Sequence, residues 1–181
     1  METNNEITYA KPMLGFMEAV KICFNKFFDF TGRARRSEYW WFALFQILVS
    51  IPCTILDELL DFAVGFSGIN TIASLALLFP ALSVTWRRLH DTGRSGWWYG
   101  ISCILLAIGI IIGIIMVTVN GISGGDMIDD DALFSVLFGA SSLAVWIPII
   151  AATVLAIICF VFTLLDSHTT ENKYGPSPKY Q

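Results

Sequence analysis

Four long apolar runs divide the chain, and short polar segments separate them. The runs cover residues 39–56, 69–86, 98–119 and 143–165. Each is close to the ~20 residues that an α-helix needs to cross a bilayer core about 30 Å thick. Three runs contain a proline (Pro52, Pro80 and Pro148), which membrane helices tolerate because neighbouring groups satisfy the freed carbonyl. The pattern predicts an all-α membrane protein with four transmembrane helices.

The segment before the first run, residues 14–30, has a different periodicity. Its apolar side chains recur at helical spacing, and polar residues such as Glu18 and Lys21 lie largely on the remaining face. This is typical of an amphipathic helix lying in the membrane interface. A helix packed on a soluble neighbour is the alternative, although the chain offers little soluble protein for such packing.

The predicted elements define a simple organisation. We expect a polar N-terminal tail (1–13), a single four-helix transmembrane domain (14–178) and a polar C-terminal tail (167–181). Because the first twelve residues lack the basic and apolar regions of a cleaved signal peptide, we expect the first span to direct insertion.

Composition agrees with a membrane location. Hydrophobic residues make up 55% of the chain, charged residues only 14%, and the mean hydropathy is +0.66, whereas a soluble domain is about a quarter charged. A net charge of −4, with no basic face, argues against a nucleic-acid partner. The cysteines are far apart and without a CxxC pair: Cys23, Cys53, Cys103 and Cys159. They are interpreted as small buried hydrophobes, and no metal or cofactor is expected.

The distribution of charge predicts an orientation. Of the eleven Lys and Arg residues, six precede position 39, three lie in the 87–96 loop and two in the tail. The other two loops contain seven acidic residues and no basic one, four of the acids in the segment 120–131. Since Lys and Arg are enriched in cytoplasmic loops, we expect both termini and the 87–96 loop in the cytoplasm.

The stretch 86–98 contains the densest chemistry. Its polar and aromatic residues include Arg87, Arg88, His90, Asp91, Arg94, Ser95, Trp97 and Trp98. If the preceding helix continues, Asp91 lies four residues after Arg87 and three after Arg88, spacings that share one face. In the structural interpretation, Asp91 orients an arginine, His90 lies at an interface, and Trp97 and Trp98 anchor the membrane boundary.

A second hypothesis concerns binding. It combines six arginines expected at one depth: Arg33, Arg35, Arg36, Arg87, Arg88 and Arg94. Guanidinium groups match phosphate oxygens bidentately, and basic pockets between helix ends bind anionic head groups. The face is therefore a candidate site for anionic lipid or another phosphate-bearing partner. Positive-inside topology alone also places arginines there.

Two further alternatives stay open. In an enzyme, His90 would act as general base, Asp91 as its orienter, and Ser95 or water as nucleophile. Adjacent helical residues point about 100° apart, and no GxSxG, HExxH or Walker motif is present. Ion-coupled transport is disfavoured because the central parts of the four spans lack charged residues and histidine. A small pore formed by a homo-oligomer stays an open alternative. We favour a non-enzymatic membrane protein.

Three motifs resemble a known family. They are residues 30–41 (FTGRARRSEYWW), the segment from Pro80 through Trp98, and residues 171–178 (ENKYGPSP). Together, over about residues 14–178, they resemble the bacterial family called domain of unknown function 805, the YhaH-like proteins. The resemblance implies a small polytopic protein of the bacterial inner (plasma) membrane. It implies no activity, and residues 120–131 look like an extension relative to shorter members.

Overall fold

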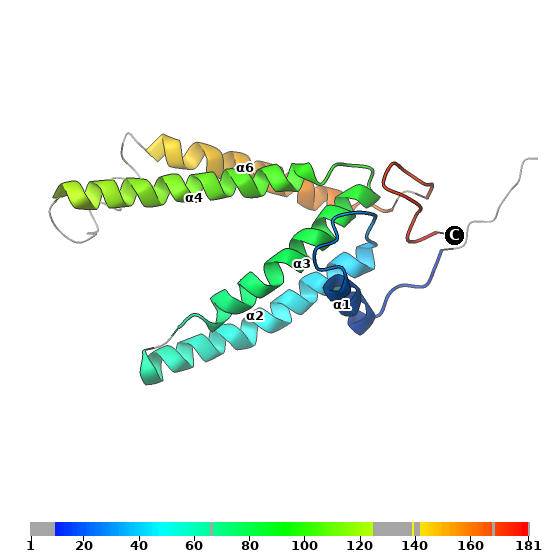
Figure 1. Cartoon of the computed structure of the whole chain (residues 1–181), viewed down its shortest axis with the longest axis horizontal. Helices are drawn as coiled ribbons and strands as arrows, with labels where there is room; N and C mark the ends of the chain where they lie inside the picture. The colour runs from blue at the N-terminus through cyan, green and yellow to red at the C-terminus, as the bar shows by residue number, and fades with distance from the viewer. Residues whose placement is uncertain (1–9, 66, 125–138, 140–141, 168, 181) are drawn as a thin grey trace, which may run out of the picture. The chain divides into compact units, whose positions relative to one another are not determined.

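The computed structural model describes residues 10–65, 67–124, 139, 142–167 and 169–180. These residues form four long helices and one short helix. Within these residues the helices are α1 (Phe16–Asn25), α2 (Arg36–Val64), α3 (Ile69–Asp91), α4 (Trp97–Gly124) and α6 (Ser142–Leu164) (Figure 1). Four segments are long and apolar enough to cross a membrane: Arg36–Ala63, Ile69–Asp91, Trp97–Val119 and Leu143–Leu164. The predicted fold class is confirmed.

The first span extends further than predicted. Helix α2 begins at Arg36 rather than Tyr39 and ends at Val64 rather than Leu56, so the acidic cluster 57–61 is helical. The expectation that this cluster lies in a loop is wrong. Leu and Glu are good helix formers, and residues 57–64 contain neither glycine nor proline. Gly65, whose φ of 66° lies in the left-handed region, ends the helix.

Two other boundaries differ from the sequence prediction. Helix α1 is shorter than the predicted 14–30, because the chain leaves the helical conformation at Lys26. Helix α4 continues to Gly124, so the beginning of the predicted loop 120–131 is helical. Residues 125–131 lie outside the described part of the chain.

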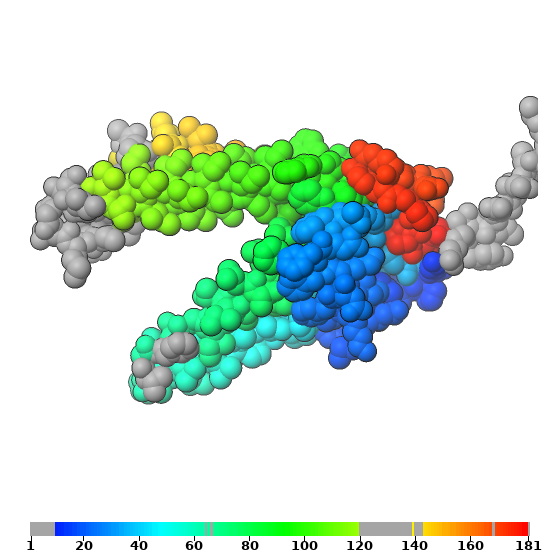
Figure 2. All heavy atoms as spheres, in the orientation of Figure 1, coloured from blue at the N-terminus to red at the C-terminus, as the bar shows by residue number. Residues whose placement is uncertain are grey.

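The chain divides into two compact units. One contains α1, α2, α3 and the segment from Phe162 onward, and the other contains residues 97–161. In the first unit, buried apolar side chains of α1, α2, α3 and the segment before α2 form a common core: Cys23, Ala34, Phe42, Leu77 and Val84. Figure 2 shows the N-terminal segment through α1, in blue, covering part of α2 and α3.

Helix α1 packs on the beginning of α2. The ring of Phe24 lies 6.0 Å from that of Phe42 and 5.8 Å from that of Phe45. The indole Nε1 of Trp41 donates a hydrogen bond of 2.8 Å to the carbonyl of Leu14. The amphipathic face of α1 is therefore covered in part by protein, and its position in the membrane interface stays a prediction.

The side chain of Asp57 joins α2 to α3. Its Oδ1 accepts hydrogen bonds from the amides of Gly68 and Ile69 at 3.0 and 2.7 Å, and its Oδ2 accepts one from Asn70 at 2.9 Å. Helix α3 has no cap from its own N-cap residue, Gly68. An acid from the preceding helix therefore satisfies the free amides at the start of α3.

In the second unit, α4 and α6 approach closely at a glycine. A Cβ at Gly109 would lie 2.7 Å from Cγ1 of Ile149, whereas one at Gly113 would lie 3.7 Å from Val145. The buried hydroxyl of Ser102 donates a 2.8 Å hydrogen bond to the carbonyl of Ala152. The close approach at Gly109 is expected for helices that associate through small residues.

Candidate functional site

Three polar segments meet in the first unit, where α2 begins and α3 ends. They are residues 30–38, 87–94 and 162–180. The first two are brought together because α2 and α3 form a hairpin, so the start of one helix lies beside the end of the other (Figure 1). We call the resulting cluster the polar hub and define it by six residues: Arg33, Glu38, Arg87, Arg88, His90 and Asp91.

Asp91 is the centre of the polar hub. Its Oδ1 lies 2.9 Å from Nε of Arg33, and its Oδ2 lies 2.5 Å from Nη1 of Arg88. All three side chains are almost completely buried. Burying a charge without a partner costs several kcal/mol, so one carboxylate stabilises two arginines that could not otherwise be buried. Of the two predicted spacings, the i,i+3 pair with Arg88 is the one that forms.

The same two arginines hold the C-terminal segment. Nη1 of Arg33 donates to the carbonyls of Thr170 and Gly175 at 3.0 and 3.2 Å. Nε of Arg88 donates to the carbonyl of Thr163 at 3.3 Å, and Nη2 donates to that of Leu165. Each guanidinium thus connects Asp91 to backbone acceptors of the tail, which uses the fixed fork geometry of arginine.

Arg87 has a different partner. Its Nη1 lies 2.5 Å from Oε1 of Glu38, and the thiol of Cys23 lies 4.0 Å from the same oxygen. Burial, followed by the charge of Glu38, raises the pKa of the Cys23 thiol to about 12, so this cysteine stays protonated and unreactive. Nε and Nη2 of Arg87 have no hydrogen-bond partner among the described residues.

His90 contacts the tail with its ring. The ring stacks on Tyr174 with centroids 3.7 Å apart and an interplanar angle of 4°. Nδ1 lies 3.1 Å from the carbonyl of Gly32, so it must be the protonated nitrogen when it makes this bond. The amide of Asn172 donates a 3.0 Å hydrogen bond to the carbonyl of His90. Sequence motifs 30–41, 80–98 and 171–178 therefore touch one another here.

The geometry does not form the pair that the enzyme hypothesis requires. Nδ1 of His90 faces a backbone carbonyl, and both carboxylate oxygens of Asp91 bind arginines. A base needs its orienting group within hydrogen-bond reach, and Asp91 is occupied elsewhere.

The remaining residues of the 86–98 stretch close the turn after α3. The guanidinium of Arg94 lies 3.6 Å from the centroid of the Phe162 ring, a cation–π distance. Gly96 lies against the ring of Trp86 so closely that a Cβ there would overlap it. Trp97 and Trp98 begin α4 and are exposed, as an anchoring role requires.

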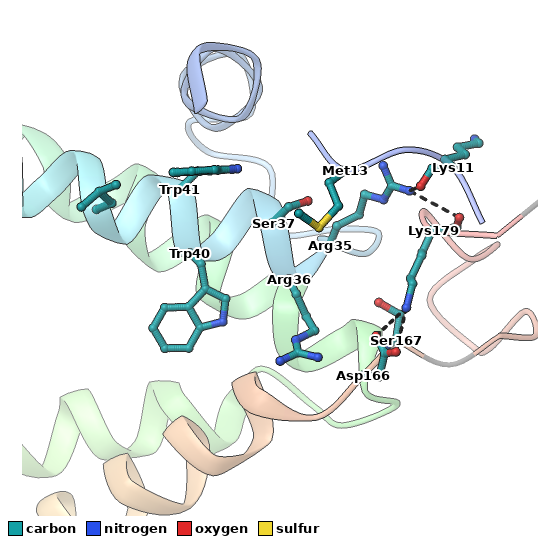
Figure 3. Close-up of a pocket in the computed structure, with 11 residues that line it drawn as sticks. Lys11, Met13, Arg35, Arg36, Ser37, Trp40, Trp41, Asp166, Ser167 and Lys179 are labelled. Carbon is teal, nitrogen blue, oxygen red and sulfur yellow. Dashed lines mark hydrogen bonds and ion pairs between the residues drawn. The ribbon is translucent and has the colours of Figure 1, made fainter. Parts of the chain in front are cut away.

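Arg35 and Arg36 line a pocket of about 530 Å³. Its described lining residues include four cationic side chains, Lys11, Arg35, Arg36 and Lys179, and one carboxylate, Asp166. Its apolar side is formed by Met13, Trp40, Trp41 and Leu44 (Figure 3). We call it the terminal pocket, because residues near both ends of the chain form part of its wall.

Arg35 connects the two ends of the chain. Its Nη1 donates to the carbonyl of Pro12 at 2.9 Å, and its Nη2 donates to those of Lys11 and Lys179 at 3.0 and 3.4 Å. The amide of Lys11 donates to the carbonyl of Lys179 at 2.8 Å. Figure 3 shows the Arg35 side chain reaching toward both lysines, while Arg36 and Trp40 extend from another face of α2.

The charged groups of the terminal pocket differ in how they are paired. Nζ of Lys179 lies 2.7 Å from Oδ2 of Asp166, and this contact lowers the pKa of Asp166 and raises that of Lys179. The side chain of Arg36 is exposed and makes no hydrogen bond or ion pair with any residue that the structure describes, although its charge adds to the lowering of the Asp166 pKa. Its guanidinium is therefore available to a ligand.

Sequence reasoning missed part of this site. The predicted binding face contains the six arginines but neither Glu38 of the polar hub nor Lys11, Asp166 and Lys179 of the terminal pocket, which lie far apart in the chain. The acids Glu38 and Asp166 sit at the ends of apolar runs, at positions where a charge needs a partner. That placement was the available signal.

The fold and the polar hub define a class: an all-helical polytopic membrane protein whose buried charges gather at one end of a helical hairpin. The chain belongs to the family described as "Protein of unknown function (DUF805)", which matches residues 27–127. The predicted family is confirmed, over a shorter range than the expected 14–178. The tail that completes the polar hub lies beyond the matched range.

Individual relatives agree with this assignment. The Escherichia coli K12 inner membrane protein YhaH is 41% identical over 76 residues, which cover 41% of this chain and 63% of YhaH. The inner membrane protein YhaI of the same strain is 32% identical over 110 residues, covering 61% of this chain and 91% of YhaI. No solved structure matches. The chain is a multi-pass inner-membrane protein.

Proposed function

We propose that this protein is a non-enzymatic inner-membrane protein that binds an anionic phospholipid in the terminal pocket. The observation that carries the proposal is the unpaired guanidinium of Arg36 beside an apolar wall at the beginning of a membrane span. Cations beside apolar side chains at a helix end are what an anionic head group and its acyl chains need.

The dimensions of the pocket favour an amphiphile over a free anion. Arg36 and Leu44 are eight residues apart on α2, which corresponds to about 12 Å along a helix. A ligand that reaches both must combine a charged group with an apolar chain. Arg36 and Trp40 are one turn apart and share a face. No side chain caps the first amides of α2. The partial positive charge of the helix dipole therefore lies uncapped at the end of the helix that carries Arg36.

The six predicted arginines differ in their contacts and therefore in their proposed roles. Arg33, Arg87 and Arg88 are bound to buried carboxylates, and Arg94 lies over an aromatic ring. These four therefore serve the fold. The proposed head-group contact is Arg36, assisted by Lys11.

The proposal includes the predicted orientation, in which the polar hub and the terminal pocket face the cytoplasm. All Lys and Arg residues lie in segments at this end of the spans or at the span ends themselves, which is the arrangement that the positive-inside rule favours. A reporter fused near residue 125 tests it, since a cytoplasmic reporter there would contradict the orientation.

Native mass spectrometry in mild detergent tests the binding. The full chain is purified with phosphatidylglycerol, and retained lipid is compared for wild type, Arg36→Ala and Lys21→Ala. Lys21 is an exposed cation of α1 outside the pocket and serves as the matched control. We expect Arg36→Ala to retain several-fold less lipid and Lys21→Ala to behave as wild type.

Two results would count against the proposal. Equal retention by Arg36→Ala and wild type would remove the head-group contact. Displacement of the lipid by millimolar inorganic phosphate would show that the pocket recognises the phosphate alone and does not use its apolar wall.

A further inference from the structure

We propose that lipid binding in the terminal pocket is coupled to docking of both ends of the chain, and that Arg35 is the positioning residue of this coupling. The inference rests on the proposed function and deepens it. It assigns Arg35, which the sequence placed among the head-group ligands, a role that acts through the backbone of other residues.

Arg35 is placed to organise the pocket wall and not to meet the ligand first. Its guanidinium donates to three backbone carbonyls, two from residues 11–12 and one from Lys179, and the residue is only 9% exposed. The Lys11 and Lys179 backbones are also hydrogen-bonded directly to each other, and Ala10 pairs with Tyr180. One buried fork thus fixes where both lysines lie.

Docking of the two ends brings like charges together. Four cations then line one pocket, and among the lining residues that the structure describes Asp166 is the single carboxylate. Like charges that share a site repel one another, most strongly where water is partly excluded. A phosphate group beside Arg36 would reduce this repulsion, so the lipid stabilises the docked ends more than the undocked ends.

Ser167 provides an independent indication that the pocket accepts a polar ligand. The residue lines the pocket, is 7% exposed, and its hydroxyl has no hydrogen-bond partner among the described residues. Buried polar groups in native proteins are nearly always satisfied. A hydroxyl at this position is a spare donor for a phosphate oxygen.

Linkage makes the coupling reciprocal. If the lipid binds only the form with docked ends, docking increases lipid affinity by the same factor by which the lipid favours docking. A change of anionic lipid in the surrounding leaflet would therefore change the exposure of the two ends.

Hydrogen exchange of the full chain in nanodiscs tests this coupling. Amide protection in segments 10–13 and 176–180 is measured in phosphatidylglycerol and in phosphatidylcholine, at the positions that carry an amide hydrogen: Ala10, Lys11, Met13, Ser177, Lys179 and Tyr180. For wild type we expect several-fold slower exchange in phosphatidylglycerol. Arg36→Ala should remove this lipid dependence, and Lys21→Ala should keep it. Arg35→Ala should give fast exchange in both lipids and several-fold weaker lipid retention.

Two further variants distinguish the proposed role of Arg35 from a general folding defect. Arg35→Lys keeps the charge but loses the fork, so it should expose both ends while melting at nearly the wild-type temperature. The double variant Lys11→Gln plus Lys179→Gln leaves the backbone contacts in place, and we expect it to keep the ends protected in both lipids.

The outcomes separate the two proposals. Loss of lipid retention in Arg36→Ala, with equal protection of wild type in both lipids, would overturn the coupling and leave the binding site intact. Undiminished lipid retention in Arg36→Ala would overturn the binding site itself. Full lipid retention by a folded Arg35→Lys protein with exposed ends would show that Arg35 is not the positioning residue.

Discussion

The polar hub of the first unit and the α4–α6 pair of the second unit are held together in different ways. In the polar hub, Asp91 bridges two buried arginines, and these arginines bind backbone carbonyls of the tail. Between α4 and α6 the contacts include a glycine against Ile149 and one hydroxyl on a carbonyl. The polar hub is specified by charge and by the direction of its hydrogen bonds, whereas the α4–α6 contact is specified by the size of the side chains.

This difference shows how a small membrane protein can specify a structure. Between apolar helices in lipid, the water-driven term disappears, and association depends on close packing and a few polar contacts. Such contacts are short-range and similar at many positions along a helix. A buried ion pair is directional, so the polar hub can fix segments that are more than seventy residues apart, as Arg88 and Leu165 are.

The largest expected effect is on the polar hub. Asp91→Asn keeps the size of the side chain but leaves Arg33 and Arg88 without a counter-charge. Removing one partner of a buried pair typically costs about 3–5 kcal/mol, and we expect a loss of this size in the free energy of unfolding, measured in detergent by denaturant titration. Asp166→Asn, an exposed control, should cost less than about 1 kcal/mol. If Asp91→Asn were as stable as wild type, the bridging role would be excluded.

The α4–α6 contact gives the next largest effect. A Cβ at Gly109 would meet Ile149 at 2.7 Å, whereas one at Gly113 would be at an ordinary 3.7 Å from Val145. Overpacking costs about 1–3 kcal/mol, so Gly109→Ala should be destabilising and Gly113→Ala nearly neutral. Thermal unfolding of the two variants side by side measures the difference. Equal melting temperatures would mean that size does not specify this pair.

A smaller effect is expected where the tail meets α3. Tyr174→Ala removes the ring that stacks on His90, an interaction worth about 0.5–1.5 kcal/mol beyond its buried area. Because Arg33 still binds Gly175, we expect the tail to loosen rather than dissociate. Limited proteolysis after residue 166 should be faster, by a few-fold, while Tyr174→Phe should match wild type. An unchanged rate for Tyr174→Ala would show that the arginines alone hold the tail.

The smallest effect is a dependence on pH from the exposed pair of Asp166 and Lys179. The pKa of Asp166 lies below its ordinary 3.8 because Lys179 donates to it, so its contribution is complete above pH 3.8 and disappears as the pH falls through the lowered value. The pKa of Lys179 lies above its ordinary 10.5, so its contribution is complete below pH 10.5 and disappears as the pH rises further.

Between these limits the pair should add no pH dependence. Exposed pairs contribute about 0–1 kcal/mol, and the stability difference between wild type and Asp166→Asn should be smaller at pH 3 than at pH 7. A difference that persists unchanged at pH 3 would contradict the assignment.

Much of the fold could be predicted from the sequence, because it depends on local pattern. Apolar runs of about 20 residues predict spans whatever surrounds them, and the Arg88–Asp91 spacing predicts a pair on one helical face. The predicted end of α2 is too early. Acidic residues after an apolar run are typical of a loop, but here helix propensity continues the helix to Val64, before Gly65.

The candidate site could be predicted only in part. The arginines were identified by residue type, but type does not reveal a partner. Arg33 and Arg36 are three residues apart in one motif, yet the first is buried against Asp91 and the second is exposed in the terminal pocket. What separates them is the tertiary arrangement of α2, α3 and the tail, which joins residues such as Arg35 and Lys179 across the whole chain.

The three amides held by Asp57 have a consequence for biogenesis. The start of a helix normally presents free N–H groups, and each one left without an acceptor in hydrocarbon costs several kcal/mol. In this chain the preceding helix supplies the acceptors, so the turn between α2 and α3 needs fewer waters as it crosses the bilayer. The two helices can therefore leave the insertion machinery together, as a hairpin in which the three amides at the start of α3 already have hydrogen-bond acceptors.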